Sequence, residues 1–195
     1  MQTQKDEIRE EILAVAEIEF LNKGFKGTSM RTIAKKANTT LGNIYNYFES
    51  KEAILEAVMG HVPEAIEEMM VKHEEMEVTE QISIQEMLSQ IEEVGAEAFG
   101  FDILLSRPFV VLMEGCKGTK YETYSKQFYE IVAHHLGEHL GNGQELMGDV
   151  ISHSFITALL FIGKSKVSLE EKKKTFLKYI EMIILGILAS QMQGE

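Results

Sequence analysis

The sequence predicts an all-α protein of about nine helices, and three observations support this fold class. Apolar residues recur at spacings of three and four almost throughout the 195 residues, as on one face of a helix. No segment has the pattern that would convincingly indicate a strand. The chain also holds only two prolines and no long low-complexity tract, which argues against a disordered or linker-rich protein.

The first helix is expected to have one apolar face, made of Ile8, Ile12, Val15, Ala16 and Phe20. Gly24 follows the last periodic residue, where glycine commonly ends a helix. Thr28 is a suitable N-cap for a short second helix. The inner side of that second helix is expected to hold Met30, Ile33, Ala34 and Ala37.

A break at residues 37–39 is expected to precede a third, very short helix. Asn38 tolerates the left-handed conformation that a tight turn needs, and Thr40 is a suitable N-cap. The third helix is expected to run to about Phe48, with Ile44 and Phe48 facing inward at a spacing of four. Helix, helix, three-residue break and short helix is the spacing of a helix-turn-helix, whose second member lies in the major groove of DNA.

Ser50 is expected to cap a long fourth helix, so the chain is divided into a DNA-binding domain at 1–50 and a second domain at 51–195. The second domain is expected to contain helices at 51–76, 83–98, 119–140, 144–163 and 168–190. A broken stretch with short apolar pieces at 101–105 and 108–114 is expected between the second and third of these. The last two are apolar on more than one face, which a second copy of the chain would cover most simply. The expected interface residues are Phe155, Leu159, Ile180, Ile183, Ile184 and Ile187.

The formal net charge of −12 argues against a nucleic-acid binder, but the distribution of the charges reverses this impression. From Lys23 to Lys51 there are six basic residues and one acidic residue, whereas from His61 onward there are 11 Lys or Arg and 22 Asp or Glu. A surface that faces phosphate groups needs such local positive charge. A charge run is more often simply a solvated face.

Residues 8–58, and most closely residues 24–55, GFKGTSMRTIAKKANTTLGNIYNYFESKEAIL, resemble the DNA-binding domain of TetR-family transcriptional regulators. The matching positions are Gly24, Phe25, Thr28, Ser29, Arg31, Ile33, Ala34, Gly42, Ile44, Tyr45, Tyr47, Phe48, Lys51 and Glu52. The resemblance is sharp over about a quarter of the chain, while the later helices are similar to the family in number and length only.

The resemblance implies which residues contact DNA: Thr28, Ser29, Arg31, Thr40, Leu41, Gly42, Asn43, Tyr45, Asn46, Tyr47 and Lys51. Thr28 and Lys51 would bind phosphate, and Arg31 would reach a base edge. Where family members often have a DNA-contacting lysine, this chain has Leu41, which suits a thymine methyl group. The residues taken singly leave other roles open, since the tyrosines could be packing residues, Lys51 a surface lysine and Arg31 the partner of an acid on the first helix.

The resemblance also implies a second domain that binds a small molecule and forms a homodimer. A ligand there would change the separation of two DNA-reading heads, and a two-fold dimer reads half-sites about 34 Å apart. The candidate pocket residues are Met87, Ile91, Phe99, Phe101, Phe109, Met113, Cys116, Tyr121, Tyr124 and Phe128. Each of these is also consistent with an ordinary core residue.

Other sensing roles have weaker support in the sequence. His135 and His139 share a helical face near His134 and Glu138, but such pairs are more commonly surface or structural residues than metal ligands. Cys116 has no partner cysteine, so it is a weak candidate for an oxidation sensor. We therefore expect no cofactor and no metal.

Two functions of other classes remain as alternatives. An enzyme is not expected, because no nucleophile elbow, phosphate loop or HExxH zinc motif occurs in the sequence. A helical adaptor would not need a Gly-x-Ile-Tyr-x-Tyr-Phe helix in the only basic segment. The single cysteine, and apolar stretches shorter than the ~20 residues that span a bilayer, predict a cytoplasmic protein without a membrane partner. We expect a repressor that a small apolar ligand releases from a palindromic operator.

Overall fold

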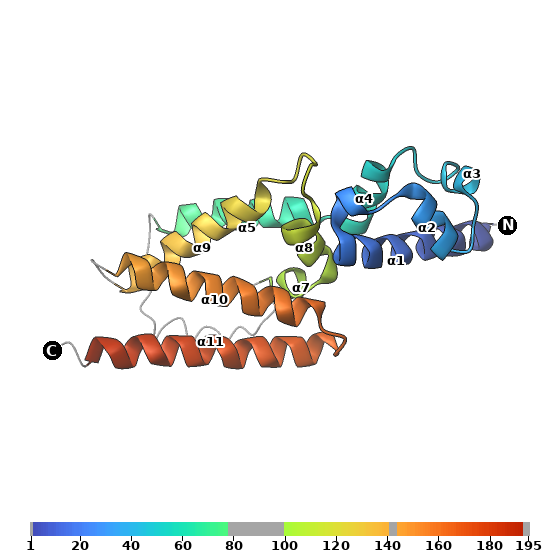
Figure 1. Ribbon diagram of the computed structural model, residues 1–195. Helices are drawn as coiled ribbons and strands as arrows, with labels where there is room; N and C mark the ends of the chain where they lie inside the picture. The colour runs from blue at the N-terminus through green and yellow to red at the C-terminus, as the bar shows by residue number, and fades with distance from the viewer. Residues whose placement is uncertain (1, 78–99, 141–143, 193–195) are drawn as a thin grey trace. The chain divides into compact units, whose positions relative to one another are not determined.

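The computed structural model describes residues 2–77, 100–140 and 144–192 (Figure 1). Within these ranges the chain forms ten α-helices and one π-helical turn, and no strand. The bounds are α1 Gln2–Gly27, α2 Met30–Lys36, α3 Leu41–Ile44, α4 Lys51–Met59, α5 Val62–Glu77, α7 Phe101–Leu104, α8 Arg107–Val110, η1 Val111–Gly115, α9 Tyr124–Leu140, α10 Glu145–Lys164 and α11 Leu169–Met192. The all-α prediction is confirmed, and the helix expected at 83–98 lies outside the described residues.

The helices pack into two compact units. The first contains the described residues up to Glu64 together with Arg107–Ser125, and the second contains the described residues of Ala65–Ser106 and Lys126–Glu195. These units are defined by packing alone. The functional division at residue 50 therefore stays a prediction.

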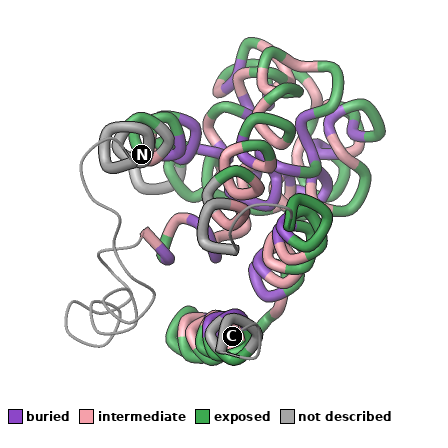
Figure 2. The backbone as a smooth tube through the Cα atoms, turned by 90° about the vertical axis from the view of Figure 1, so that its left-hand side faces the viewer, coloured by how far each residue is buried: buried purple, intermediate pink, exposed green. Residues whose placement is uncertain are grey.

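Helix α1 is the central element of the first unit, since it packs against α2, α4, α8 and η1. The predicted face of α1 supplies Ile12, Ala16 and Phe20, each of which is fully buried. Figure 2 shows the buried stretches of the backbone in purple. Further fully buried residues of this unit come from α2, α3, α4, α8 and η1: Ile33, Ile44, Ile54, Phe109 and Val111. The core of the unit thus holds the short helices α2 and α3 against α1 and α4.

The prediction of one continuous helix over 51–76 is wrong. Helix α4 ends at Met59 because Gly60 adopts φ 58° and ψ −127°, and α5 begins two residues later at Val62. Buried residues continue in helical phase through this break, so periodicity did not reveal it. The sequence signal for a break between two helices was Gly60 with Pro63 three residues later, since proline is favoured in the first turn of a helix.

Two other helices are shorter than predicted at one end. Helix α3 ends at Ile44 and continues as a turn, in which the amides of Tyr47 and Phe48 both donate to the Ile44 carbonyl. Helix α9 begins at Tyr124 rather than at residue 119, because the Thr119 hydroxyl and amide both bond the Cys116 carbonyl in a preceding turn. Local hydrogen bonds of this kind compete with helix formation.

Gly24 interrupts α1 as predicted, with φ 67° and ψ 175°. This region of backbone conformation is accessible essentially only to glycine. The nearest atom to an added Cβ is the Gly115 carbonyl oxygen at 3.6 Å, an ordinary contact, so a side chain would be opposed by the backbone and not by crowding.

Gly24→Ala is therefore expected to lower the free energy of unfolding by about 1–3 kcal/mol, measured by urea denaturation. Gly137→Ala is the matched control, since Gly137 lies inside α9 with open space around its Cα. We expect the control to raise the stability by about 0.5–1 kcal/mol. Equal effects of the two substitutions would contradict the strained conformation of Gly24.

In the second unit α10 and α11 pack side by side, as Figure 1 shows. The Phe176 ring of α11 is fully buried. Its centroid lies 5.3 Å from the ring centroid of Phe101 on α7 and 5.3 Å from that of Phe155 on α10. The buried Lys172 ammonium donates to the Gly163 carbonyl oxygen at 2.6 Å, at the end of α10. These contacts connect both long helices with α7.

Helix α10 is long and apolar enough to cross a membrane by length and composition, although only 22% of its apolar window is buried within the described structure. The nine-residue apolar stretch at 155–163 is part of this longer helix. Core helices of soluble proteins meet the same criteria, so the finding is weak evidence for a membrane span.

Candidate nucleic-acid interface

A tight turn joins α2 to α3 as the sequence predicts. The amide of Ala37 donates to the Ile33 carbonyl at 2.9 Å, and the amide of Thr39 donates to the Ala34 carbonyl at 2.9 Å. Between them Asn38 has φ 47°, the left-handed conformation that asparagine tolerates best among residues other than glycine. The chain reverses direction within three residues, which gives α2 and α3 the arrangement of a helix-turn-helix.

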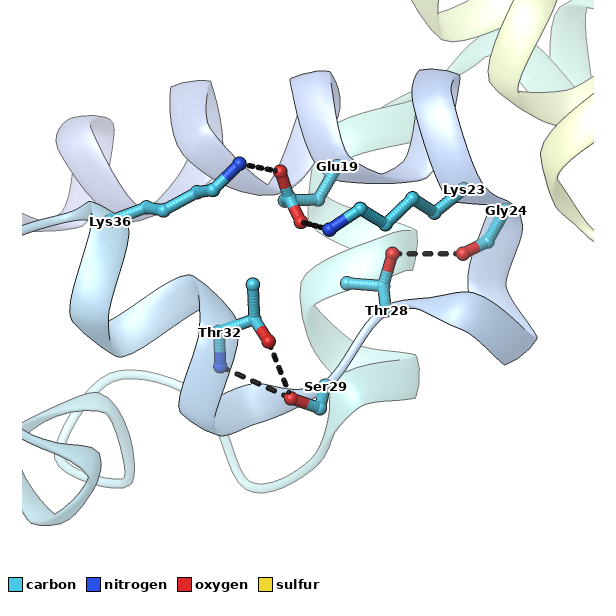
Figure 3. A network of polar contacts seen from close by, with 7 residues as sticks. All are labelled: Glu19, Lys23, Gly24, Thr28, Ser29, Thr32 and Lys36. Carbon is cyan, nitrogen blue, oxygen red and sulfur yellow. Dashed lines mark hydrogen bonds and ion pairs between the residues drawn. The ribbon is translucent and has the colours of Figure 1, made fainter.

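The N-cap of α2 is Ser29 and not Thr28, so this prediction is wrong. The Ser29 Oγ accepts a hydrogen bond from the Thr32 amide at 3.1 Å. Thr28 is buried instead, and its hydroxyl donates to the Gly24 carbonyl at 2.8 Å (Figure 3). Two adjacent cap-forming residues are equivalent in the sequence, and only the path of the chain after Gly24 separates them. The Thr28 hydroxyl is thus bonded within the fold, and a phosphate contact by this residue stays a prediction.

Helix α3 is held by one cap and two buried side chains, as predicted. The Thr40 Oγ1 accepts from the Asn43 amide at 3.1 Å, while Ile44 is fully buried and Phe48 nearly so. A helix of four residues has no stability of its own, so this packing keeps it in place.

The outer side of α3 and its following turn is open and mostly polar. The Tyr45 side chain is 54% exposed, Asn46 and Gly42 are exposed, and Leu41 and Asn43 are half-buried. A Cβ added at Gly42 would meet nothing within 4 Å. The structure therefore brings these five predicted contact residues together on one accessible surface, which we call the α3 surface.

Two basic residues of α1, Lys5 and Arg9, lie beside this surface, and neither was among the contact residues predicted from the sequence. The Lys5 ammonium lies 5.9 Å from the centroid of the Tyr47 ring, and the Arg9 guanidinium 5.5 Å from that of Phe48. Both cations lie about 40 residues away from their rings in the sequence, so no local pattern could have indicated the pairs. They extend the positive charge of the unit towards the turn after α3.

Lys51 is half-buried, and its ammonium forms hydrogen bonds within the first unit. It donates to the Phe25 carbonyl at 2.6 Å and to the Thr28 carbonyl at 2.7 Å, and it lies 4.0 Å from the centroid of the Phe25 ring. Phe25 belongs to the end of α1, after the interruption at Gly24, and Thr28 belongs to the link between α1 and α2. Lys51 thus connects the start of α4 to that link, and one N–H remains for a further acceptor.

Glu19 is the centre of an ion-pair network that joins α1 to α2 (Figure 3). Its carboxylate, only 1% exposed, accepts from the Lys23 ammonium at 3.0 Å and from the Lys36 ammonium at the end of α2. The Lys36 bond, with help from Lys23, lowers the pKa of Glu19 in spite of its burial. With Lys51, three of the six basic residues between Lys23 and Lys51 therefore make polar contacts within the fold, whereas Arg31 and Lys35 are exposed.

Because the folded-state pKa of Glu19 lies below its unfolded value of about 4.5, its contribution to stability is present above that pH and is lost as the pH falls through the folded-state pKa. At neutral pH we expect Glu19→Gln to be less stable than the wild type by about 1–2 kcal/mol. The difference should shrink steadily below about pH 4.5 in urea titrations.

Glu10→Gln is the control for this prediction, because Glu10 is exposed and its ion pair with the neighbouring Arg9 lies on the surface. It should leave the stability within about 0.5 kcal/mol of the wild type at each pH. A Glu19→Gln difference that persists unchanged at pH 3 would show that the carboxylate is not stabilised by its two lysines.

The predicted pocket residues are distributed over both units. Phe109, Met113, Cys116, Tyr121 and Tyr124 belong to the first, Phe101 and Phe128 to the second, and Met87, Ile91 and Phe99 lie outside the described residues. Burial raises the pKa of the Cys116 thiol to about 11, so the group stays protonated and unreactive at neutral pH. Among the three histidines singled out in the sequence, His134 has an exposed side chain, and the side chains of His135 and His139 are not described.

The predicted interface residues are partly used within the chain. Leu159, Ile184 and Ile187 are buried, while Phe155, Ile180 and Ile183 are half-buried. Other apolar residues of α10 and α11 are exposed instead: Leu146, Met147, Val150, Phe161, Met182 and Leu185. The sequence located the apolar helices but not the faces that remain uncovered.

Comparison with known proteins matches the first unit to one family. Residues 12–58 match the model of the bacterial regulatory proteins of the tetR family. The HTH-type transcriptional repressor KstR2 of Mycolicibacterium smegmatis is 39% identical over 51 residues, which are 26% of this chain and 25% of that protein. The HTH-type transcriptional regulator UidR of Escherichia coli K12 is 37% identical over 59 residues, 30% of each chain. The match thus spans less than a third of these relatives.

Solved structures with similar chains are also regulators. A transcriptional regulator from Aquifex aeolicus VF5 is 16% identical over 90% of this chain and 99% of its own, with a TM-score of 0.46. NalD, the secondary repressor of the MexAB-OprM multidrug efflux pump in Pseudomonas aeruginosa, is 16% identical over 92% and 96%, with a TM-score of 0.42. Such low scores add nothing to the fold described above. Residues 12–58, which include most of α1, the α2–turn–α3 arrangement and the start of α4, are thus similar to the bacterial regulatory proteins of the tetR family.

Proposed function

We propose that the protein is a sequence-specific DNA-binding transcriptional regulator, acting as a homodimeric repressor on a palindromic operator. The observation that carries this proposal is the exposed α3 surface, fixed on a rigid α2–turn–α3 arrangement by Ile44 and Phe48. The tyrosine and asparagine side chains on the outer side of this short helix and its turn do not pack against the core. Their polar groups suit base edges and phosphates in a major groove.

The charge of the first unit supports the same function. Lys5, Arg9, Arg31 and Lys35 are exposed around α1 and α2, on a chain whose net charge is −12. Local positive charge on an acidic protein attracts the DNA backbone to one surface and keeps the rest away from it. Thr28 and Lys51 support the fold of this surface, and Lys51 has one N–H left for phosphate.

Dimerisation is supported by the uncovered apolar residues of α10 and α11. Phe161 is 76% exposed and Leu185 is 51% exposed, and side chains of this size seldom gather on the surface of a monomer. A second copy of the same two helices would cover them by two-fold symmetry and would set the spacing of two α3 surfaces.

Phe161→Glu is expected to shift the protein from dimer to monomer in sedimentation equilibrium at micromolar concentration, because it would bury a charge in the interface. Since Phe161 is exposed in the single chain, the helical circular dichroism of the variant protein should equal that of the wild type. Ile18→Glu on α1, at 48% exposure, is the control and should stay dimeric. A monomeric wild type, or a dimeric Phe161→Glu protein, would contradict this interface.

The effector is proposed to be a small apolar molecule bound by the second functional domain, at residues 51–195, with loss of DNA affinity on binding. Buried aromatic and methionine side chains of this domain, such as Phe109 and Met113 in the first unit, favour an apolar ligand. We propose neither an enzymatic activity nor a cofactor or metal, and a cytoplasmic location follows from the proposed role on DNA. A helical protein–protein adaptor remains the alternative function.

Selection from a pool of random duplexes with the purified chain tests this function. We expect enrichment of a palindrome and an affinity that falls steeply as the salt concentration rises. Tyr45→Ala should weaken binding without loss of stability, because the ring is exposed, whereas Asn22→Ala on the exposed part of α1 should bind as the wild type does. Absence of enrichment at low salt, with and without cell extract as a source of ligand, would favour the adaptor.

A further inference from the structure

A chain of side-chain amides runs across the α3 surface. The Asn46 Nδ2 donates to the Asn43 Oδ1 at 3.2 Å, and the Asn43 Nδ2 donates to the Thr39 Oγ1 at 2.8 Å. Asn46 is exposed, while Asn43 and Thr39 are half-buried. The outermost amide is therefore oriented from behind by two residues that are themselves fixed at the turn and on α3.

The bond to Asn43 uses only part of the hydrogen-bonding capacity of Asn46. An amide side chain has two N–H donors and a carbonyl oxygen with two lone pairs, so one N–H and the oxygen remain for another molecule. An acceptor and a donor side by side are the complement of the N7 acceptor and N6 donor of adenine in the major groove. Guanine presents two acceptors there, cytosine a donor, and thymine one acceptor and a methyl group.

The composition of the α3 surface favours the same base. Residues 37–50 contain no lysine or arginine, the side chains that most often pair with guanine. Asparagine pairs with adenine in this way, and two asparagines, Asn43 and Asn46, lie on the α3 surface, whereas Asn38 belongs to the turn before α3. Asn43 already uses both ends of its amide for Thr39 and Asn46, so Asn46 is the one that can offer a donor and an acceptor together.

We propose that Asn46 determines specificity by bidentate hydrogen bonding to one adenine in each half-site, with Asn43 and Thr39 as positioning residues. This inference rests on the DNA-binding function proposed above. The inference predicts that each operator half-site carries an adenine at the position that faces the first residues after α3. Asn46, held by Asn43 and Thr39, would recognise that base pair.

The test uses the full chain and the duplex that it selects, with each adenine of the half-site replaced in turn by 7-deazaadenine. This base keeps Watson–Crick pairing but lacks the N7 acceptor. We expect one position at which the replacement weakens wild-type binding about tenfold. Asn46→Ala should bind both duplexes equally and should select sites without a preference for adenine there. Asn22→Ala should keep both the preference and the penalty.

A variant of Thr39, the innermost residue of the hydrogen-bonded series Asn46–Asn43–Thr39, tests the positioning role. Thr39→Val keeps the shape of the side chain and removes the acceptor for Asn43. A positioning role predicts a smaller 7-deazaadenine penalty in this variant, whereas a merely structural role would weaken binding to both duplexes by the same factor. That equal weakening would remove Thr39 from the proposal.

The failures of the two proposals are distinguishable. If the wild type selects no duplex, the DNA-binding function itself is overturned. If it selects a palindrome, but Asn46→Ala retains the same adenine preference or the same 7-deazaadenine penalty, the function stands and the role of Asn46 is overturned.

Discussion

Ile44→Ala is expected to lower the free energy of unfolding of the first unit by about 2–5 kcal/mol, as deletion of a fully buried aliphatic side chain does. Ile44 is the one buried residue of the four-residue helix α3, so its side chain is a main anchor of this helix. Ile44 therefore combines a large loss of stability with a direct effect on the α3 surface.

The same substitution should weaken binding to the selected duplex by about tenfold or more, since only molecules with α3 in place can bind. Urea denaturation and DNA titration are to be measured on the same preparations. Ile18→Ala is the matched control, because Ile18 lies on α1 with 48% of its surface exposed, and its stability should change by no more than about 0.5 kcal/mol. An Ile44→Ala protein with full DNA affinity would mean that α3 does not contact DNA.

Lys51→Met is expected to lower the free energy of unfolding by about 2 kcal/mol, since it removes two charge-assisted hydrogen bonds and leaves their carbonyl acceptors without this donor. Methionine keeps the apolar stem against the Phe25 ring, so the loss reports on the ammonium itself. Lys35→Met, at an exposed position of α2, is the control and should be nearly neutral.

DNA binding by the two lysine variants separates the structural role of Lys51 from a role on phosphate. If the remaining N–H of Lys51 binds a phosphate, the slope of log affinity against log salt should fall by about 0.9 in Lys51→Met. An unchanged slope with reduced stability would leave Lys51 as a residue of the fold alone. Stability equal to that of Lys35→Met would contradict the two hydrogen bonds on which the prediction rests.

The sequence by itself determined the all-α class, the α2–turn–α3 arrangement and most of the α3 surface. Thr40 as N-cap, Asn38 in a left-handed turn and Ile44 with Phe48 facing inward all follow from local rules, and all are confirmed. These features depend on residues within a few positions of one another. Backbone geometry and apolar spacing are therefore sufficient to predict them.

Only the tertiary structure decided what the polar and charged groups of this region do. In the sequence Thr28 and Ser29 are equal candidates for the N-cap of α2, and the path of the chain after Gly24 decides that Thr28 is buried and Ser29 is the cap. Lys51 has the pattern of a surface lysine, but in the folded chain its ammonium bonds the carbonyls of Phe25 and Thr28. Lys36 meets Glu19 across 17 residues, and Lys5 meets Tyr47 across more than 40. A hydrogen bond or ion pair depends on distances of about 3 Å, and for residues far apart in the chain such distances are set by the packing of whole helices, which the pattern of a single sequence does not contain.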